Sequence, residues 1–274
     1  MGENMDEKLM NLPLEKKVEK AEEVIKEAYE KFEPEEMAIA FTGGKDSTLL
    51  LWLVKRVCDK NNYEMPNVMF INEGDVFEEI WDFVFDLSEK WGFELKIAEN
   101  VDVLRLVKKI GDPVKVRELN EFNRQELKKI GFQGDEFPFE PESFVGNHLM
   151  KTVAMKMFII DNGIKALFTG IRWDEQEARR NETYFSPRDD PEHTRIHPIL
   201  HFTEKDVWDA TFKYKIPFNK LYAEGYRSLG AKSTTKKIDD RPAWEQDLEK
   251  VPERAGRRQD KEGIMKRLRD LGYM

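Results

Sequence analysis

The stretch FTGGKDST at residues 41–48 decides which fold this sequence is expected to adopt. Before it lies the apolar run at residues 37–41, which is too short for a helix and suits a buried strand. After it come residues 49–54, LLLWLV, which are typical of a buried helix. Gly43 and Gly44 let the backbone approach a ligand without a Cβ clash. Successive N–H groups and the helix N-terminus then favour an anion, so the stretch predicts a phosphate-binding loop.

The side chains of the loop support the same interpretation. Lys45 supplies positive charge, and three residues supply hydroxyl groups: Thr42, Ser47 and Thr48. Asp46 is unusual beside a phosphate unless a divalent cation intervenes, so we expect Mg²⁺ with Asp46 as a ligand. The spacing differs from both GxxxxGK[ST] and GxGxxG. Two glycines alone would fit an ordinary strand–helix turn equally well, but the complete string favours the phosphate loop.

Further strands and helices alternate along the chain. Beyond the first strand, strands are expected at residues 68–72, 93–97, 166–170 and 195–200, and helices in the first 36 residues and at 77–91, 148–160 and 264–271. This order predicts an α/β fold with a parallel sheet covered on both faces. The predicted organisation is an N-terminal helical segment (1–36), an α/β nucleotide-binding domain (37–220) with a variable insertion (101–146), and an irregular tail (221–274) that closes the site.

Composition excludes several classes of protein. The 274 residues include 45 Lys and Arg against 54 Asp and Glu, a net charge of −9, so nucleic acid is not expected as the main ligand. The single cysteine, Cys58, excludes an internal disulfide, a CxxC pair, a cysteine-ligated iron–sulfur cluster and a zinc site of thiolates. No apolar run approaches the roughly 18 residues needed to cross a bilayer. The first residues lack an apolar signal core, and we therefore expect a cytoplasmic protein without a membrane partner.

The motifs also resemble a known group. TGGKDST resembles the SGGxDS pyrophosphate loop (PP-loop) of the ATP pyrophosphatase superfamily, which cleaves ATP between its α- and β-phosphates. The resemblance implies a Rossmann-like, adenine nucleotide alpha hydrolase-like sheet. Further segments are similar to the phosphoadenosine phosphosulfate (PAPS) reductase family: INEG at 71–74 followed by Phe77, GIRWDE at 170–175 followed by Arg179, IHPILHFTEKDVW at 196–208, IPFNKLY at 216–222 and GYRSLG at 225–230. Residues 253–257, Asp260 and residues 272–273 resemble the C-terminus of the sulfate adenylyltransferase small subunit.

The reactions of this group differ in their need for cysteine. Its reductases carry a C-terminal cysteine whose thiolate attacks sulfur, and no cysteine follows Cys58 here. Residues 231–234 read AKST where the iron–sulfur reductases carry cysteines, and Cys58 itself suits a small buried core position. The resemblance therefore favours adenylyl transfer from ATP to sulfate, giving adenylyl sulfate and pyrophosphate. It also implies a GTPase partner subunit, and a homo-oligomer is left open.

Other functions remain open on the sequence. The chain could be a member of the PAPS reductase family that acts on adenylyl sulfate or PAPS with an external thiol or a partner. It could adenylylate another acceptor, such as a tRNA base. A non-catalytic nucleotide-binding subunit is a further alternative, although an intact TGGKDST argues against it.

The expected site residues follow from the loop and the resemblance together. Lys45, Arg172 and Arg227 are the expected catalytic residues, with Arg172 just after a strand, at the edge where open α/β sheets bind ligands. Asp174 and Glu175 suit a role in orienting Arg172, a nucleotide or metal contact, or a helix-start acid pair. Arg254 and Arg257 are equally compatible with a ligand contact and with solvated charge. The set expected to bind the nucleotide and pyrophosphate is Thr42, Gly43, Gly44, Lys45, Asp46, Ser47, Thr48, Gly170, Asp174, Glu175, Arg254 and Arg257.

Overall fold

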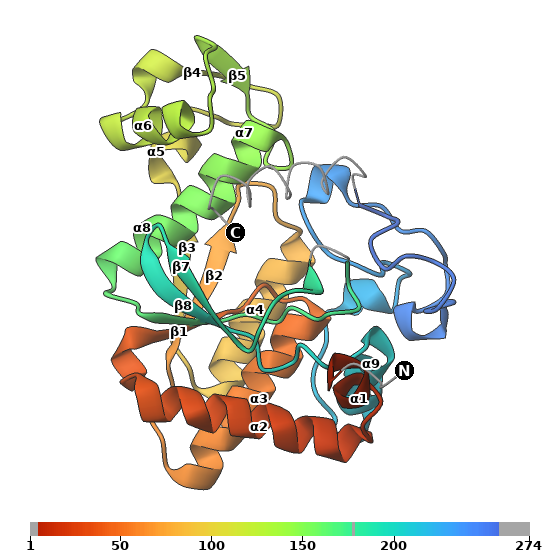
Figure 1. Ribbon diagram of the computed structural model, residues 1–274. Helices are drawn as coiled ribbons and strands as arrows, with labels where there is room; N and C mark the ends of the chain where they lie inside the picture. The colour runs from red at the N-terminus through yellow and green to blue at the C-terminus, as the bar shows by residue number, and fades with distance from the viewer. Residues whose placement is uncertain (1–4, 177–178, 258–274) are drawn as a thin grey trace.

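A six-stranded sheet forms the centre of the computed structural model, which describes residues 5–176 and 179–257. The strand order is β3-β2-β1-β6-β8-β7, and every neighbouring pair is parallel except β7 and β8 (Figure 1). The strands are β1 (Met37–Ala40), β2 (Asn67–Asn72), β3 (Leu95–Glu99), β6 (Ala166–Phe168), β7 (Phe185–Asp189) and β8 (Glu192–Ile196). The predicted Rossmann-like α/β class is therefore confirmed.

Helices cover both faces of this sheet because its strands are apolar on both sides. One face packs against α2 (Leu14–Lys31), α3 (Lys45–Asn61), α4 (Glu78–Trp91) and α9 (Glu204–Lys213). The other face packs against α8 (Ala154–Asp161). Alternate residues of each strand divide between the two cores: Ile39, Val68 and Phe168 face the first, and Ala38, Met69 and Leu167 face the second.

The boundaries differ from the expected ones where proline or local capping intervenes. Pro13 separates α1 (Met5–Met10) from α2, so the N-terminal segment holds two helices. The helix expected at 148–160 is α7 (Phe144–Asn147), a π-helical stretch (His148–Val153) and α8 in succession. The helix α9 begins at a capping box formed by Thr203 and Asp206. The helix expected at 264–271 lies outside the described residues.

The strand expected at 195–200 ends at Ile196, and its antiparallel partner β7 was not expected. The sequence of β7, FSPRD, contains a proline and alternates little, which suits only the sheet edge that it occupies.

The insertion at 101–146 packs around a core of its own, which explains its weak periodicity. It contains α5 (Val101–Leu104), β4 (Pro113–Lys115), α6 (Glu121–Lys129) and β5 (Glu136–Pro138), and it lies beyond one end of the sheet (Figure 1). Val114, Leu127 and Phe137 are buried together there with residues of the π-helical stretch.

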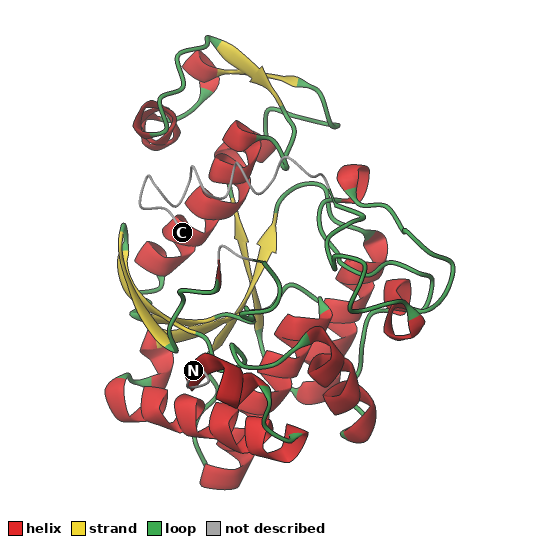
Figure 2. Cartoon of the chain, turned by 45° about the vertical axis from the view of Figure 1, so that its right-hand side comes forward, coloured by secondary structure: helices red, strands yellow, loops and turns green. Residues whose placement is uncertain are grey.

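Short 3₁₀ turns and loops complete the chain. The turns are Pro34–Glu36, Val116–Glu118, Lys220–Tyr222, Lys232–Thr234 and Ala243–Glu245. Figure 2 shows that residues 214–257, which follow α9, run mostly as loops along one side of the molecule. Within the described part of the chain, no helix is both long and apolar enough to cross a membrane. A cytoplasmic location, a homo-oligomer and the domain boundaries remain predictions.

The buried carboxylate of Glu126 links the insertion to α8, which packs on the sheet. Glu126 of α6 accepts hydrogen bonds from Lys129 at 2.8 Å and from Lys156 of α8 at 2.9 Å, and it lies 3.2 Å from His148 Nε2. Burial alone would raise the pKa of Glu126, but these partners outweigh it and lower the pKa to about 2.

We predict that Glu126→Gln lowers the free energy of unfolding by about 3 kcal/mol at pH 7, because Lys156 then stays buried beside a weaker acceptor. The pKa of Glu126 is lower in the folded protein than the value of about 4.3 in the unfolded chain. The stabilisation by its ionised carboxylate is therefore fully present above about pH 4.3 and is lost as the pH falls toward 2. Urea denaturation at pH 7 and pH 3 measures both effects. Glu121→Gln, which removes an exposed carboxylate from the same helix, is the control and should leave stability nearly unchanged. Equal losses at both pH values would contradict the account.

Candidate nucleotide-binding site

The phosphate loop joins β1 to α3 and is held by its own hydroxyl groups. The Thr42 N–H donates to Ser47 Oγ at 3.1 Å, and the Ser47 and Thr48 hydroxyls donate to the Gly44 carbonyl at 3.0 and 2.8 Å. Gly43 has a φ of +71°, and a Cβ there would lie 3.0 Å from Val84 of α4. The sequence needs glycine here because the left-handed backbone and the packed α4 both exclude a side chain.

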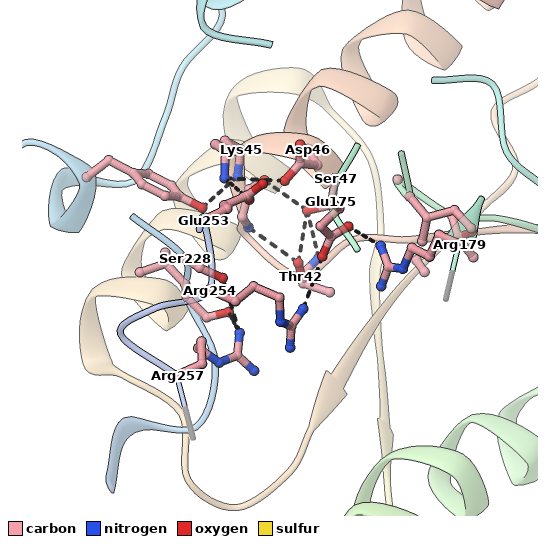
Figure 3. Close-up of a pocket in the computed structure, with 17 residues that line it drawn as sticks. Thr42, Lys45, Asp46, Ser47, Glu175, Arg179, Ser228, Glu253, Arg254 and Arg257 are labelled. Carbon is pink, nitrogen blue, oxygen red and sulfur yellow. Dashed lines mark hydrogen bonds and ion pairs between the residues drawn. The ribbon is translucent and has the colours of Figure 1, made fainter. Parts of the chain in front are cut away.

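A cavity of about 250 Å³ opens beside this loop, at the carboxyl ends of β1 and β6. The cavity is lined on the loop side by Thr42, Gly44, Lys45, Asp46 and Ser47, which were expected to bind the nucleotide (Figure 3). Thr169, Gly170 and Glu175 line it after β6, and Ser228, Glu253, Arg254 and Arg257 line it from the tail. A Cβ on Gly170 would lie 3.0 Å from the Asp46 backbone, so this glycine lets β6 and the loop meet.

Lys45 lies buried at the floor of the site, with 2% of its surface exposed. Its ammonium group donates to Glu253 and to the Arg227 carbonyl, and lies 3.6 Å from Asp46 Oδ2. Burial alone would lower the pKa of Lys45, but the neighbouring carboxylates of Asp46 and Glu253 raise it, so the side chain is charged.

Arg172 is fully buried next to Lys45 and is surrounded by carboxylates. It pairs with Asp46, donates to Asp174 Oδ1 at 2.8 Å and donates to Glu253 Oε2 at 2.5 Å. Glu253 therefore joins the two buried cations that stand at the phosphate loop. Burial would raise the pKa of Glu253, but Arg172 and Lys45 lower it, and this carboxylate is ionised.

The carboxylate that was expected to bind magnesium has a partner within the protein. The Asp46 carboxylate faces Arg172, and burial raises its pKa. Among the residues that the structure describes, no group of three or more metal-ligating side chains lies together. The Mg²⁺ assignment to Asp46 stays a prediction.

Arginines surround the mouth of the cavity. Arg179 and Arg254 both pair with Glu175, the second at 3.0 Å, and Figure 3 shows them approaching from opposite sides. Arg257 donates to the Leu229 carbonyl at 2.5 Å and to Glu142 of the insertion at 3.2 Å. Of these, Arg179 was not among the expected ligand-binding residues, although it follows the GIRWDE motif at 170–175.

Five of the expected residues do not line the cavity: Gly43, Thr48, Arg172, Asp174 and Arg227. The partners of Arg227 and Asp174 are structural. Arg227 is 2% exposed and donates to Glu204 Oε2 at 2.8 Å and to the tail carbonyls of Asp247 and Leu248. Asp174 orients Arg172 and accepts from the Glu204 N–H at the start of α9. The structure therefore places Arg227 where it fastens the tail, and its catalytic role has no support from its position.

Tyr222, Glu253 and Thr169 line the cavity but were missed as site residues. The Lys45 N–H donates to Tyr222 Oη at 2.9 Å, so Tyr222 supports the loop. Tyr222 and Glu253 both lie in segments that resemble the family, at 216–222 and 253–257. This resemblance could have identified them as site residues.

The sequence model of the phosphoadenosine phosphosulfate reductase domain matches residues 36–237. The chain belongs to this family. Among curated relatives, the PAPS reductase of Alkalilimnicola ehrlichii is 25% identical over 209 residues, which is 76% of this chain and 73% of that protein. The adenosine 5′-phosphosulfate reductase of Geobacillus thermodenitrificans is 23% identical over 225 residues, or 82% of this chain and 83% of that one. A probable FAD synthase of Caenorhabditis elegans is 28% identical over 223 residues, or 81% of this chain but 34% of that protein.

Solved structures agree on the fold of this PAPS reductase family member. The FMN adenylyltransferase of Candida glabrata has a TM-score of 0.61 at 18% identity, covering 93% of this chain and 94% of that one. A PAPS reductase from Candida auris, in a phosphate complex, has a TM-score of 0.57 at 16% identity, covering 85% and 94%.

One expectation is wrong. These relatives are named as PAPS or adenosine 5′-phosphosulfate reductases and as an FAD synthase, which overturns adenylyl transfer to sulfate as the main function. The missing cysteine had excluded thiol chemistry within the chain, but that exclusion did not identify the acceptor. The GTPase partner rested on the same resemblance and has no support.

We predict that Glu253→Gln tightens the binding of inorganic pyrophosphate about tenfold. The carboxylate competes with phosphate for Lys45 and Arg172, and a charge-assisted hydrogen bond is worth about 1.5–3 kcal/mol. Isothermal titration calorimetry measures the change. Glu249→Gln, which alters an exposed carboxylate on the same tail, is the control. Weaker or unchanged binding would show that Glu253 does not compete with the ligand.

Proposed function

We propose that this protein transfers the adenylyl group of ATP to a phosphorylated acceptor, with FMN as the acceptor to test first. The observation that carries the proposal is a phosphate loop with two buried cations and no thiol beside it. The single cysteine, Cys58, is a residue of α3. Its Sγ lies 2.9 Å from the hydroxyl of Tyr29 in α2, and burial raises the pKa of the thiol. A protonated, buried thiol away from the cavity is not a nucleophile for bound substrate.

The phosphate loop and the charged residues around it suit displacement at the α-phosphorus. The loop N–H groups and Lys45 would hold the β- and γ-phosphates, which leave as pyrophosphate. Arg172 would neutralise charge that develops on the leaving group, in a site where burial strengthens that interaction. Arg179 and Arg254, at the mouth, would hold the phosphate of the acceptor in line for attack.

The choice of FMN rests on relatives and not on the cavity alone. Two probable FAD synthases, of Caenorhabditis briggsae and Caenorhabditis elegans, are 25% and 28% identical to this chain over 83% and 81% of its length. The chain spans about a third of those proteins, 35% and 34%. Transfer to FMN also needs no cysteine, in agreement with the sequence.

The proposal predicts that the purified protein converts ATP and FMN to FAD and pyrophosphate. Chromatography of FAD and a coupled pyrophosphate assay follow both products. Lys45→Met should reduce kcat/KM at least about 100-fold, because it removes a buried charge from the leaving-group side. ATP binding without FAD formation, when FMN is saturating, would contradict FMN as the acceptor.

A second candidate function is reduction of PAPS or adenylyl sulfate with an external thiol, favoured by the names of two relatives above. It predicts sulfite release from either nucleotide when a dithiol is added. Cys58→Ser should leave that activity unchanged, because the buried Cys58 does not supply the thiol. Sulfite formation that depends on Cys58 would contradict this assignment.

A further inference from the structure

We propose that Thr169, His197 and Glu182 form a proton-accepting chain at the wall of the cavity, and that Thr169 receives the proton of the acceptor's attacking oxygen. The inference rests on the proposed adenylyl transfer and goes beyond it, because it names the residues that act on the acceptor.

The three side chains are in series and lead away from the cavity. Thr169 follows β6 and lines the cavity next to Gly170. Its Oγ1 lies 2.6 Å from His197 Nδ1, just beyond the end of β8. On the far side of the ring, His197 Nε2 lies 3.6 Å from Glu182 Oε2.

The neighbouring groups favour one arrangement of the protons. The Glu182 oxygen lies beyond hydrogen-bonding distance of His197 Nε2, but its negative charge favours the hydrogen of neutral His197 on that nitrogen. Nδ1 is then the acceptor, and the Thr169 hydroxyl donates to it. The remaining lone pairs of Thr169 Oγ1 are therefore available to accept a hydrogen bond from a bound ligand.

Burial and the neighbouring charges keep His197 neutral, so its ring can accept a proton. Burial lowers the pKa of His197, although Glu182 opposes the shift, and the ring is neutral near pH 7. The charged groups that face it are Glu182 from the preceding loop, Arg188 of β7 and Arg195 of β8. Arg188 donates to Glu182 at 3.1 Å and keeps that carboxylate ionised and in place. The pKa of Glu182 is lowered accordingly, against the effect of burial.

Proton transfer and bond formation are coupled in the proposed step. The acceptor enters with a proton on its attacking oxygen, as a singly ionised phosphate monoester does. That proton passes to Thr169 Oγ1 while the Thr169 proton passes to His197 Nδ1. The freed oxygen forms the bond to the α-phosphorus of ATP, and the bond to the bridging oxygen breaks with its electron pair leaving on pyrophosphate. Glu182 stabilises the imidazolium until its proton returns to solvent.

Two measurements separate this role from a structural hydrogen bond. The first is ¹⁵N NMR of the imidazole rings in the free protein, which needs no turnover. We expect His197 to be neutral with the proton on Nε2, and Thr169→Val to shift the Nδ1 resonance. His193→Asn is the matched control, because His193 is a buried histidine of β8 whose Nδ1 contacts the Pro191 carbonyl. A proton on Nδ1 would overturn the proposal.

The second measurement is the pH profile of FAD formation. We expect wild-type kcat to fall in acid as His197 becomes protonated, and Thr169→Val to lower kcat about 100-fold with little change in the KM for ATP. Thr169→Ser, which keeps the hydroxyl, should restore both the rate and the profile. Wild-type kinetics in Thr169→Val would overturn the relay. Absence of FAD formation in the wild-type protein would instead count against FMN as the acceptor, and the NMR result would still decide the proton positions.

Discussion

The ion network that joins Lys45, Arg172 and Glu253 is the interaction on which the arrangement of this site depends. Charges are costly to remove from water, and both cations are almost fully buried. They remain charged because carboxylates from separate parts of the chain meet them: Asp46 from the phosphate loop, Asp174 after β6, and Glu253 from the tail. The same requirement brings three distant segments to one edge of the sheet.

This network also explains why a ligand with several negative charges suits the cavity. Glu253 occupies the position between two cations that a phosphate group would be expected to take. A triphosphate offers more charge to the same cations than one carboxylate does. The tail is therefore part of the site, and the Arg227 contacts to Asp247 and Leu248 hold it against α9.

Sequence patterns predicted the parts of the molecule that local residues determine. Residues 37–61 combine a buried strand, a glycine-containing loop and a buried helix, and the structure follows that order. Local patterns could not predict which charged residues pair with one another. Asp46 and Arg172 are 126 positions apart in the sequence, and Lys45 and Glu253 are 208 positions apart. The edge strand β7 was missed since its proline and half-exposed residues resemble a loop. Arg227 was assigned to the ligand from its motif, whereas its position shows a contact with the tail.

A structure of the protein with a non-hydrolysable ATP analogue tests the central claim most directly. The account predicts that the β- and γ-phosphates lie within hydrogen-bonding distance of Lys45 Nζ and the Arg172 guanidinium, with the Glu253 carboxylate displaced from both. A nucleotide bound elsewhere, with the Glu253 ion pairs intact, would contradict it.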